Sequence, residues 1–193
     1  IIKNSKKKIN FQFYKKQTYN FINIGRLVDQ KNQLLILKSF KLLAEKTNYK
    51  FKLLIIGSGE NKKRLLKFIR KNNLNSSIKV TDFKKNPFPY LKKTNAFILS
   101  SIFEGLPNVI LEALTLKKLV ISSDCPTGPK EILDHGKGGL IFKMNNEFDL
   151  YKKIIFFIKN KSKSEKLVRH GYNRLTRFDY QKNLEEYLKI LNS

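Results

Sequence analysis

Short apolar runs separated by amphipathic stretches constrain the fold of this chain more than any other feature. The runs have the length of buried strands and span residues 21–24, 51–56, 78–80, 96–99, 119–121 and 139–142. Helical periodicity or helix-start signals follow several of them, which predicts helices at 31–46, 60–73, 107–117 and 129–134. An alternation of strand and helix predicts a parallel sheet with helices on both faces. We therefore expect an α/β domain with a Rossmann-like doubly wound parallel sheet.

The two ends of the chain follow other patterns. Residues 1–18 carry lysine clusters without a clear period, which predicts a linker or an edge strand that leads into a domain starting at residue 19. After residue 142 the pattern is helical only, and we expect the domain to span 19–193 and to end in a helical C-terminal tail. The tail closes with an apolar stripe at helical spacing, formed by Tyr180, Leu184, Tyr187, Leu188 and Leu191. Because the chain opens on isoleucine, we expect it to be part of a longer protein.

The composition is strongly basic. Against 40 Lys and Arg stand 15 Asp and Glu, so the formal net charge is +25, which attracts phosphates, nucleic acid and acidic lipid headgroups alike. A solvated, lysine-rich surface is the alternative explanation. The single cysteine, Cys125, excludes an internal disulfide and favours a reducing compartment. No apolar run approaches the roughly eighteen residues that a membrane-spanning helix needs.

Residues just after the strands are the first candidates for function, because open parallel sheets bind ligands beyond the carboxyl ends of their strands. Gly25 and Arg26 follow the first predicted strand, and Lys31 comes after a short loop. A guanidinium fork and an ammonium group that converge on one anion would suit a diphosphate. The alternative is a pair of solvated cations in a chain that is rich in them.

The segment after the fourth predicted strand is more informative. Gly105 permits an unusual backbone turn, and Pro107 suits the first turn of a helix. The free N–H groups and positive dipole end of that helix would hold phosphate oxygens without a metal ion. Glu104 and Glu112 bracket the helix start, and carboxylates beside a phosphate would accept hydrogen bonds from sugar hydroxyls. The alternatives are that Glu104 caps the helix and that Glu112 is a surface helix former.

The remaining polar features are weaker indications of function. A turn rich in Gly and Pro at 122–131 would hold a base or a sugar, or would be only a loop and a helix start. Gly57 and Gly59 match part of a dinucleotide-binding fingerprint, but its third glycine is absent, which argues against a dehydrogenase. His135 and His170 are isolated in the sequence, so no metal site is predicted.

Taken in order, these segments resemble the C-terminal domain of the glycosyltransferases called family four or group one, which have the GT-B fold of two Rossmann-like domains. The resemblance covers residues 20–192. Its main motif is Phe-Glu-Gly-Leu-Pro-Asn-Val-Ile-Leu-Glu-Ala at 103–113, in which seven residues separate the two glutamates. Gly-Arg-Leu-Val-Asp-Gln-Lys at 25–31 precedes this motif, and Gly-Pro-Lys-Glu-Ile-Leu at 128–133 follows it. The resemblance implies one half of a GT-B fold.

The same resemblance implies the site and the reaction. The enzyme would be a retaining glycosyltransferase of the hexosyl- or N-acetylhexosaminyl-transferase type, acting in bacterial surface polysaccharide or glycan assembly. Arg26 and Lys31 would bind the donor diphosphate, Glu104 would contact the transferred sugar, and Glu112 would hold the ribose hydroxyls. Arg26, Lys31 and Glu104 form the expected catalytic set. The expected donor-binding set is Gly25, Gly105, Leu106, Pro107, Asn108, Val109 and Glu112.

Expectations about cofactors and partners follow from the resemblance. It implies no cofactor and no metal, a nucleotide diphosphate sugar as co-substrate with a UDP-sugar favoured, and the sequence agrees in lacking an Asp-x-Asp motif. It also implies a missing N-terminal domain with the acceptor site, so this chain would be the donor-binding part and inactive alone. We expect a cytoplasmic location, with the basic surface at the anionic inner face of the cytoplasmic membrane and a glycan or lipid-linked acceptor. The alternatives are a basic nucleic-acid-binding module and a non-catalytic interaction domain; neither explains the ordered motifs, and nucleic acid is not expected as a partner.

Overall fold

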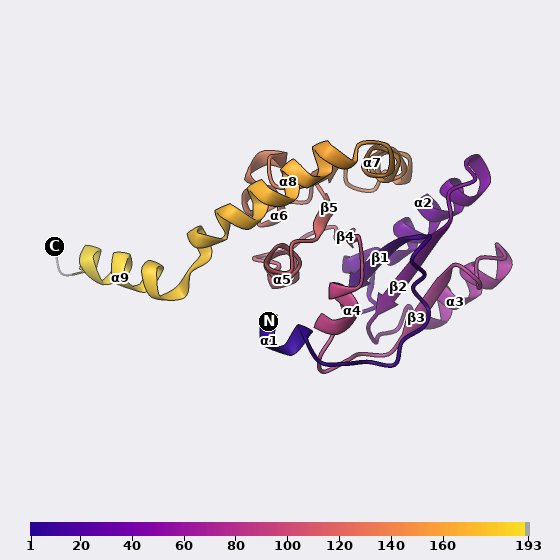
Figure 1. Cartoon of the computed structure of the whole chain (residues 1–193), viewed down its shortest axis with the longest axis horizontal. Helices are drawn as coiled ribbons and strands as arrows, with labels where there is room; N and C mark the ends of the chain where they lie inside the picture. Colours follow the sequence, from indigo (N-terminus) through magenta and orange to yellow (C-terminus); the bar gives the residue numbers. More distant parts are fainter. Residues whose placement is uncertain (192–193) are drawn as a thin grey trace.

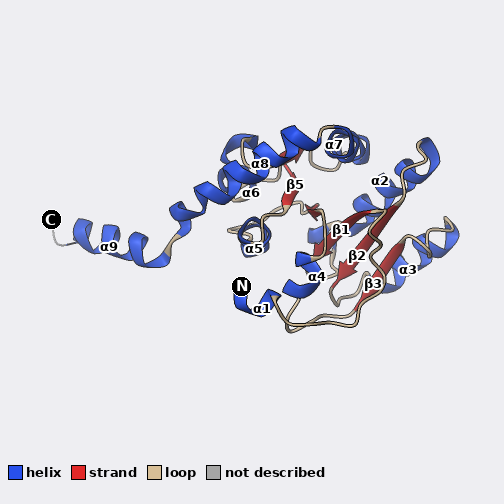
Figure 2. Ribbon diagram, viewed as in Figure 1, coloured by secondary structure: helices blue, strands red, loops and turns tan. Residues whose placement is uncertain are grey.

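A parallel sheet forms the centre of the molecule (Figures 1 and 2). The computed structural model describes residues 1–191, without the side chains of Tyr180, Lys182, Glu186, Tyr187, Lys189 and Leu191. The sheet is 6-stranded in the order β3-β2-β1-β4-β5-β6, and every neighbouring pair is parallel. The strands are β1 (Tyr19–Ile24), β2 (Phe51–Ile56), β3 (Ile78–Thr81), β4 (Ala96–Leu99), β5 (Leu119–Ser123) and β6 (Leu140–Phe142). This strand order is that of a Rossmann-like sheet, so the predicted fold class is confirmed.

Helices connect the strands and cover both faces of the sheet (Figure 2). The α-helices are α1 (Ile2–Ser5), α2 (Gln33–Lys46), α3 (Lys62–Lys71), α4 (Phe88–Lys92), α5 (Asn108–Thr115), α6 (Pro129–Ile132), α7 (Glu147–Lys159), α8 (Lys161–Asn173) and α9 (Tyr180–Leu191). Shorter 3-10 turns are η1 (Asp29–Lys31), η2 (Asp134–Gly136) and η3 (Arg174–Phe178). All four helices predicted between the strands are present, with ends shifted by a few residues.

Two apolar cores lie on the two faces of the sheet, because successive side chains of a strand point to opposite sides. Phe21 of β1 belongs to the core shared with α2, α3 and α7, where its ring meets that of Phe40 edge-on at 5.1 Å between centroids. Ile22, the next residue, belongs to the core shared with α4, α5 and α6. The sheet is therefore buried on both faces, and only the ends of its strands are left for binding.

Residues 1–18 contain no strand, which excludes the edge strand that was one of the two alternatives for this segment. After α1 the segment is irregular, and its aromatic side chains Phe11, Phe13 and Tyr14 pack against the core that contains Ile22. The Tyr14 hydroxyl donates to the carbonyl of Phe21 at 3.2 Å, and burial raises the pKa of Tyr14 well above its usual value. The segment is held over a face of the sheet by these aromatic contacts rather than paired to its edge.

The predicted helical tail consists of α7, α8, η3 and α9. α7 packs on α2, α8 contacts β5 and α5, and α9 extends away from the α/β body (Figure 1). Leu184 and Leu188 of the predicted apolar stripe are exposed, whereas the side chains of Tyr180, Tyr187 and Leu191 are outside the described residues.

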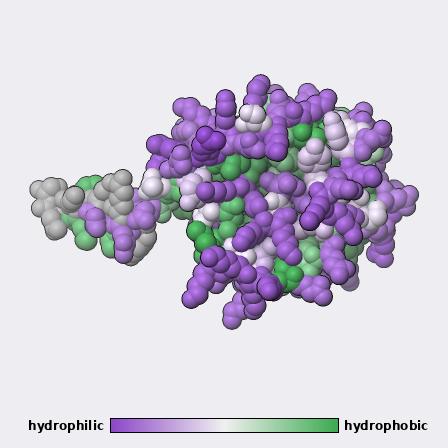
Figure 3. Space-filling view, viewed as in Figure 1, coloured by the Kyte–Doolittle hydropathy of each residue, from purple (hydrophilic) through white to green (hydrophobic). Residues whose placement is uncertain are grey.

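No helix in residues 1–191 is long and apolar enough to cross a membrane. Hydrophilic residues cover most of the face shown in Figure 3, in keeping with the excess of lysine.

Candidate functional site

The carboxyl ends of β1 and β4 lie side by side in the middle of the sheet. The chain order reverses between these strands, since β1 has β2 on its other side and β4 has β5. Loops that leave two such strands run in opposite directions and leave a crevice, which is where open α/β sheets bind ligands. The loops at 25–32 and 100–107 therefore form, with the beginning of α5, a candidate site that we call the carboxyl-edge site.

Hydrogen bonds join the two loops of the carboxyl-edge site. The backbone N–H of Ile102 donates to the carbonyl of Gln30 at 2.8 Å, and the Gln30 side chain donates to the carbonyl of Phe103 at 2.9 Å. The Ser100 hydroxyl donates to the carbonyl of Lys31 at 2.7 Å. These bonds fix the position of one loop relative to the other, so residues far apart in the sequence meet in a defined geometry.

Lys31 and Glu104 form an ion pair across the two loops. Lys31 Nζ lies 2.6 Å from Glu104 Oε1, and the same oxygen accepts a hydrogen bond from Ser101 Oγ at 2.5 Å. The side chains are only 19% and 8% exposed, so solvent screens the pair little. Both bonds use Oε1, which leaves Glu104 Oε2 without a partner among residues 1–191 and able to accept from a hydroxyl. Glu104 does not cap α5, which excludes one alternative for it.

Arg26 is exposed beside this pair. Its carbonyl accepts from the buried Gln33 side chain at 2.7 Å, so its backbone is held, while its guanidinium group lies 3.4 Å from Gln30 Oε1. It has no carboxylate partner in the described part of the chain. Lys31, in contrast, is already engaged with Glu104. An ammonium group has three donors, so Lys31 can keep Glu104 and still reach an anion together with Arg26.

The beginning of α5 faces the same site. The helix begins at Asn108 and Pro107 is its N-cap, so the expectation of Pro107 in the first turn is wrong by one position. No side chain caps the helix, and its first turn carries no acidic residue. The first N–H groups and the positive end of the helix dipole are therefore open to an anion. Asn108 is exposed, Val109 is half-buried and Pro107 is buried.

Gly105 adopts no left-handed conformation, which corrects the expectation of an unusual turn there. A Cβ atom added to Gly105 would meet nothing within 4 Å, and the next residue, Leu106, is 53% exposed. The left-handed residues are Thr127 (φ 59°) and Gly128 (φ 74°) in the turn after β5. A Cβ on Gly128 would lie 2.0 Å from the carbonyl oxygen of Gly105. Gly128 is thus required for packing, whereas Gly105 leaves open space above its backbone through which a ligand can reach it.

Gly57 and Gly59 support the loop that carries Arg26. A Cβ on Gly57 would lie 1.9 Å from the carbonyl oxygen of Gly25, and one on Gly59 would lie 2.4 Å from that of Leu27. Gly25 itself has room for a Cβ, with its nearest contact at 3.9 Å from Lys31. Close packing of two backbones therefore accounts for Gly57 and Gly59, and no dinucleotide is needed to explain them.

Glu112 lies in the second turn of α5 and is half-buried. Burial raises the pKa of its carboxyl above the ordinary value, an effect that the charge of the Ile1 ammonium group offsets only in part, and the carboxylate forms no hydrogen bond or ion pair with any residue that the structure describes. A solvated surface helix former would be neither half-buried nor shifted in pKa. A partly buried carboxylate without a hydrogen-bond partner, on the helix that begins at the site, is the kind of group that a ligand's hydroxyls satisfy.

The turn at 122–131 also reaches the carboxyl-edge site. The Thr127 hydroxyl donates to the carbonyl of Glu104, a contact that sequence reasoning missed together with those of Ser101 and Gln30. The signal available for Thr127 was its place in the Thr-Gly-Pro turn directly after a buried strand.

His170 lies 2.7 Å from an oxygen of Asp134, away from the two loops. Within residues 1–191 no group of three or more His, Cys, Asp or Glu side chains could hold a metal ion.

Comparison with known proteins gives one family. The model described as "Glycosyl transferases group 1" matches residues 4–174. An uncharacterized glycosyltransferase of Methanocaldococcus jannaschii is 49% identical over 118 residues, which cover 61% of this chain and 29% of that protein. The N-acetylgalactosamine-N,N'-diacetylbacillosaminyl-diphospho-undecaprenol 4-alpha-N-acetylgalactosaminyltransferase of Campylobacter jejuni is 29% identical over 170 residues, which cover 88% of this chain and 46% of that protein. The chain thus spans less than half the length of either relative.

Solved structures share the fold. A mutant of S. aureus TarM in complex with fondaparinux, alpha-GlcNAc-glycerol and UDP superposes with a TM-score of 0.82 at 23% identity, over 97% of this chain and 38% of TarM. Anabaena HepE in complex with UDP gives a TM-score of 0.82 at 17% identity, over 91% of this chain and 49% of HepE. At these identities the similarity concerns the fold alone.

Proposed function

Because the chain belongs to the group 1 glycosyl transferase family, we propose that its carboxyl-edge site binds the nucleotide diphosphate of a sugar donor. The observation that carries the proposal is the shielded pair of Lys31 and Glu104 beside the uncapped beginning of α5. Cationic groups and helix N–H groups suit phosphate oxygens, and a carboxylate with one unpartnered oxygen suits a sugar hydroxyl. One site therefore offers matching partners for both halves of a nucleotide sugar.

Each residue has a distinct role in this proposal. Arg26, Lys31 and the beginning of α5 stabilise the negative charge that develops on the departing diphosphate, which is commonly the largest catalytic contribution of such groups. Glu104 Oε2 accepts a hydrogen bond from the transferred sugar, while Lys31 and Ser101 hold Oε1 in place. Glu112 accepts from the ribose hydroxyls, which would also provide the partner that its half-buried carboxylate lacks. This chain thus supplies the leaving-group side of the reaction.

The rest of the proposal concerns the protein of which this chain is the donor-binding part. We propose transfer of a hexosyl or N-acetylhexosaminyl group with retention of configuration, from a UDP-sugar and without a metal ion. An N-terminal domain would bring the acceptor site, a proposal supported by relatives that are more than twice as long as the matched region. The Campylobacter relative is named for a diphospho-undecaprenol substrate, which supports a lipid-linked or glycan acceptor in bacterial glycan assembly. The location would be cytoplasmic, at the anionic inner face of the membrane.

A calorimetric titration tests the donor site. UDP, GDP and a panel of UDP-sugars are titrated into the chain with EDTA present, and saturable binding of one nucleotide is expected. Arg26→Ala removes a charge-assisted contact to phosphate and should weaken binding by about tenfold or more. Arg70→Ala is the matched control, since Arg70 is also exposed but lies at the end of α3, and it should change affinity by less than about twofold.

Two results would contradict the proposal. Absence of binding to every nucleotide would exclude a donor site formed by this chain. Equal weakening by Arg26→Ala and Arg70→Ala, with a steep loss of binding as salt is added, would show diffuse attraction of a polyanion to a surface with net charge +25. That second result would favour the nucleic-acid-binding alternative instead.

A further inference from the structure

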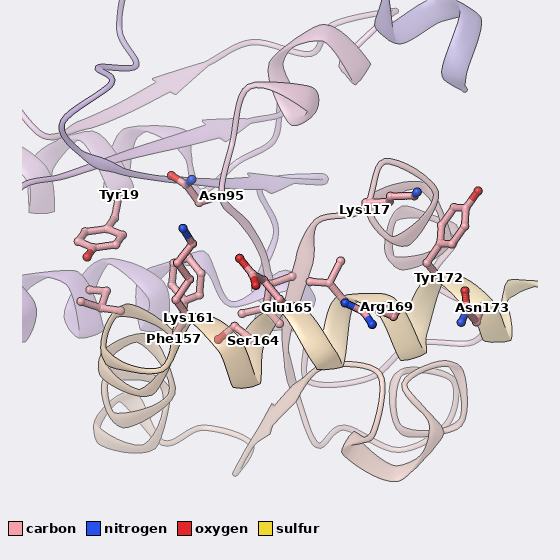
Figure 4. Close-up of a pocket in the computed structure, with 13 residues that line it drawn as sticks. Tyr19, Asn95, Lys117, Phe157, Lys161, Ser164, Glu165, Arg169, Tyr172 and Asn173 are labelled. Carbon is pink, nitrogen blue, oxygen red and sulfur yellow. The ribbon is translucent and has the colours of Figure 1, made fainter.

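A groove of about 670 Å³ lies at the end of the sheet opposite to the carboxyl-edge site. It runs between α8 and the amino ends of three strands: Tyr19 begins β1, Asn95 precedes β4, and Leu119 begins β5 (Figure 4). Because all strands are parallel, their amino ends lie on the far side from the loops that carry Arg26 and Glu104. The volume is in the range of about 300–1,000 Å³ that small-molecule sites occupy.

The floor of the groove is apolar and its ends are aromatic. Leu119, Ile158 and Val168 line it together with the ring of Phe157. Figure 4 shows Tyr19 at one end and Tyr172 at the other, with α8 running along the groove between them. An elongated apolar floor of this kind gains free energy by covering a hydrocarbon chain or a similarly extended apolar group.

The rim of the groove is mostly cationic. Lys161, Glu165 and Arg169 recur every four residues of α8, which places them on one helical face, and Lys117 comes from the turn before β5. Lys161 and Arg169 are exposed and form no ion pair with any described residue. Lys117 Nζ lies 4.4 Å from the centroid of the Tyr172 ring. Three cations face one carboxylate, so the rim favours an anionic group.

The hydroxyl group of Ser164 lacks a hydrogen-bond partner among the residues that the structure describes. It lines the groove, is 3% exposed, and its hydroxyl has no hydrogen-bond partner in the described part of the chain. A serine within a helix often donates to the carbonyl one turn earlier, and Ser164 does not. A buried hydroxyl left without a partner destabilises the folded chain, so such groups in native proteins call for an explanation. If the Ser164 side chain turned about χ1 toward the groove, a polar group of a bound ligand would supply the missing partner.

We propose that this groove binds an anionic amphiphile. Its apolar chain lies along Leu119, Ile158 and Val168, and its phosphate or carboxylate head lies at the Tyr172 end of the groove, beside Arg169 and Lys117. A free nucleotide sugar does not fit this description, because its hydroxyl-rich body would cover the apolar floor without forming hydrogen bonds. The site shares no residue with the carboxyl-edge site, so it stands or falls independently of the proposed donor binding.

Amide chemical shifts of the ¹⁵N-labelled chain locate and quantify this binding. Dodecyl phosphate is added below its micelle-forming concentration. It is expected to shift the amide signals of Leu119, Val168 and Tyr172 in a saturable way and to leave the amide signal of Gly105 unchanged. Reversing the two cations at the Tyr172 end of the groove, with Lys117→Glu and Arg169→Glu together, should weaken binding at least about tenfold.

The matched control is the double variant Lys163→Glu and Lys166→Glu, which changes the net charge by the same amount on the helix that carries Arg169. Lys163 and Lys166 are exposed and do not line the groove, so affinity should change by less than about twofold. Equal weakening in the two double variants would overturn the proposal, because it would show diffuse charge attraction. Equally tight binding of uncharged dodecyl maltoside, or shifts confined to other parts of the chain, would also overturn it.

Vesicle flotation separates the two sources of such an amphiphile. Binding to vesicles of phosphatidylcholine and phosphatidylglycerol that is lost with the rim variant and kept with the control variant would place the head group in a membrane. Binding of dodecyl phosphate without binding to those vesicles would identify a free amphiphile. Absence of both would exclude the site.

Discussion

Replacing Gly105 by alanine separates ligand binding from folding at the carboxyl-edge site. Gly105 has no positive φ and a Cβ there would meet nothing within 4 Å, so the folded chain accommodates the methyl group. Alanine also lowers the entropy of the unfolded chain, so the free energy of unfolding should stay unchanged or rise by about 0.4–1 kcal/mol. A donor that lies over this backbone would instead meet the methyl group. Overpacking of that kind costs about 1–3 kcal/mol, which is a loss of roughly 5- to 150-fold in affinity.

Gly128→Ala is the matched control for this experiment. Its φ of 74° disfavours alanine, and the new Cβ would lie 2.0 Å from the carbonyl oxygen of Gly105 and 2.6 Å from Pro107 Cδ. Urea unfolding should show a loss of at least about 2 kcal/mol for Gly128→Ala, against none for Gly105→Ala. UDP affinity is measured calorimetrically on the same samples. A Gly105→Ala chain that keeps full UDP affinity would refute the placement of the donor over Gly105, and one that unfolds more easily would refute the geometry.

Three further changes test the account. Burial raises the pKa of Glu112, so the folded chain binds the proton of this carboxyl more tightly than the unfolded chain does. The folded chain therefore loses stability relative to the unfolded chain as the pH rises above the ordinary pKa of a glutamate. Glu112→Gln should have a higher melting temperature than the wild type at pH 7 and should lose this advantage below about pH 4. Lys31→Ala leaves the shielded carboxylate of Glu104 unpaired and should cost about 2–4 kcal/mol in urea unfolding, part of which Glu104→Gln restores in the double variant; strictly additive effects would show that the two residues do not interact. Ser164→Ala removes an unpaired buried hydroxyl and should leave stability unchanged or raise it by about 1 kcal/mol, whereas a clear loss would reveal a partner for that hydroxyl.

The strands were predictable because a strand buried on both faces is a continuous apolar run bounded by polar or turn residues. All six predicted strands are present, within two residues at either end. The helix α4 was missed because it has only 5 residues and follows Pro87, which gives no helical period to recognise. The choice between a linker and an edge strand in 1–18 could not be made from the sequence, because the sequence does not tell whether Phe11, Phe13 and Tyr14 pack over a face of the sheet or pair along its edge.

The site residues were predictable as a set, but their contacts were not. Strand ends and the beginning of α5 fixed which loops would meet, since parallel strands bring their carboxyl ends together. The pair of Lys31 and Glu104 joins positions 73 residues apart, and each was expected to contact a ligand rather than the other. A backbone position that requires glycine was expected at Gly105, whereas in the structure that position is Gly128. The close approach of two loops depends on tertiary packing, which a local sequence pattern does not show.

The position of bound UDP tests the central claim most directly. The ¹⁵N-labelled chain is titrated with UDP in the presence of EDTA, and the amides of Gly25, Gly105 and Asn108 are compared with those of Leu119 and Tyr172. Saturable shifts are expected at the first three amides and none at the other two, and Arg26→Ala should move the midpoint of the titration to a UDP concentration about tenfold higher or more. Shifts confined to the amino ends of the strands, or no shift in a chain whose spectrum is that of the folded state, would contradict the assignment of the carboxyl-edge site to a nucleotide sugar.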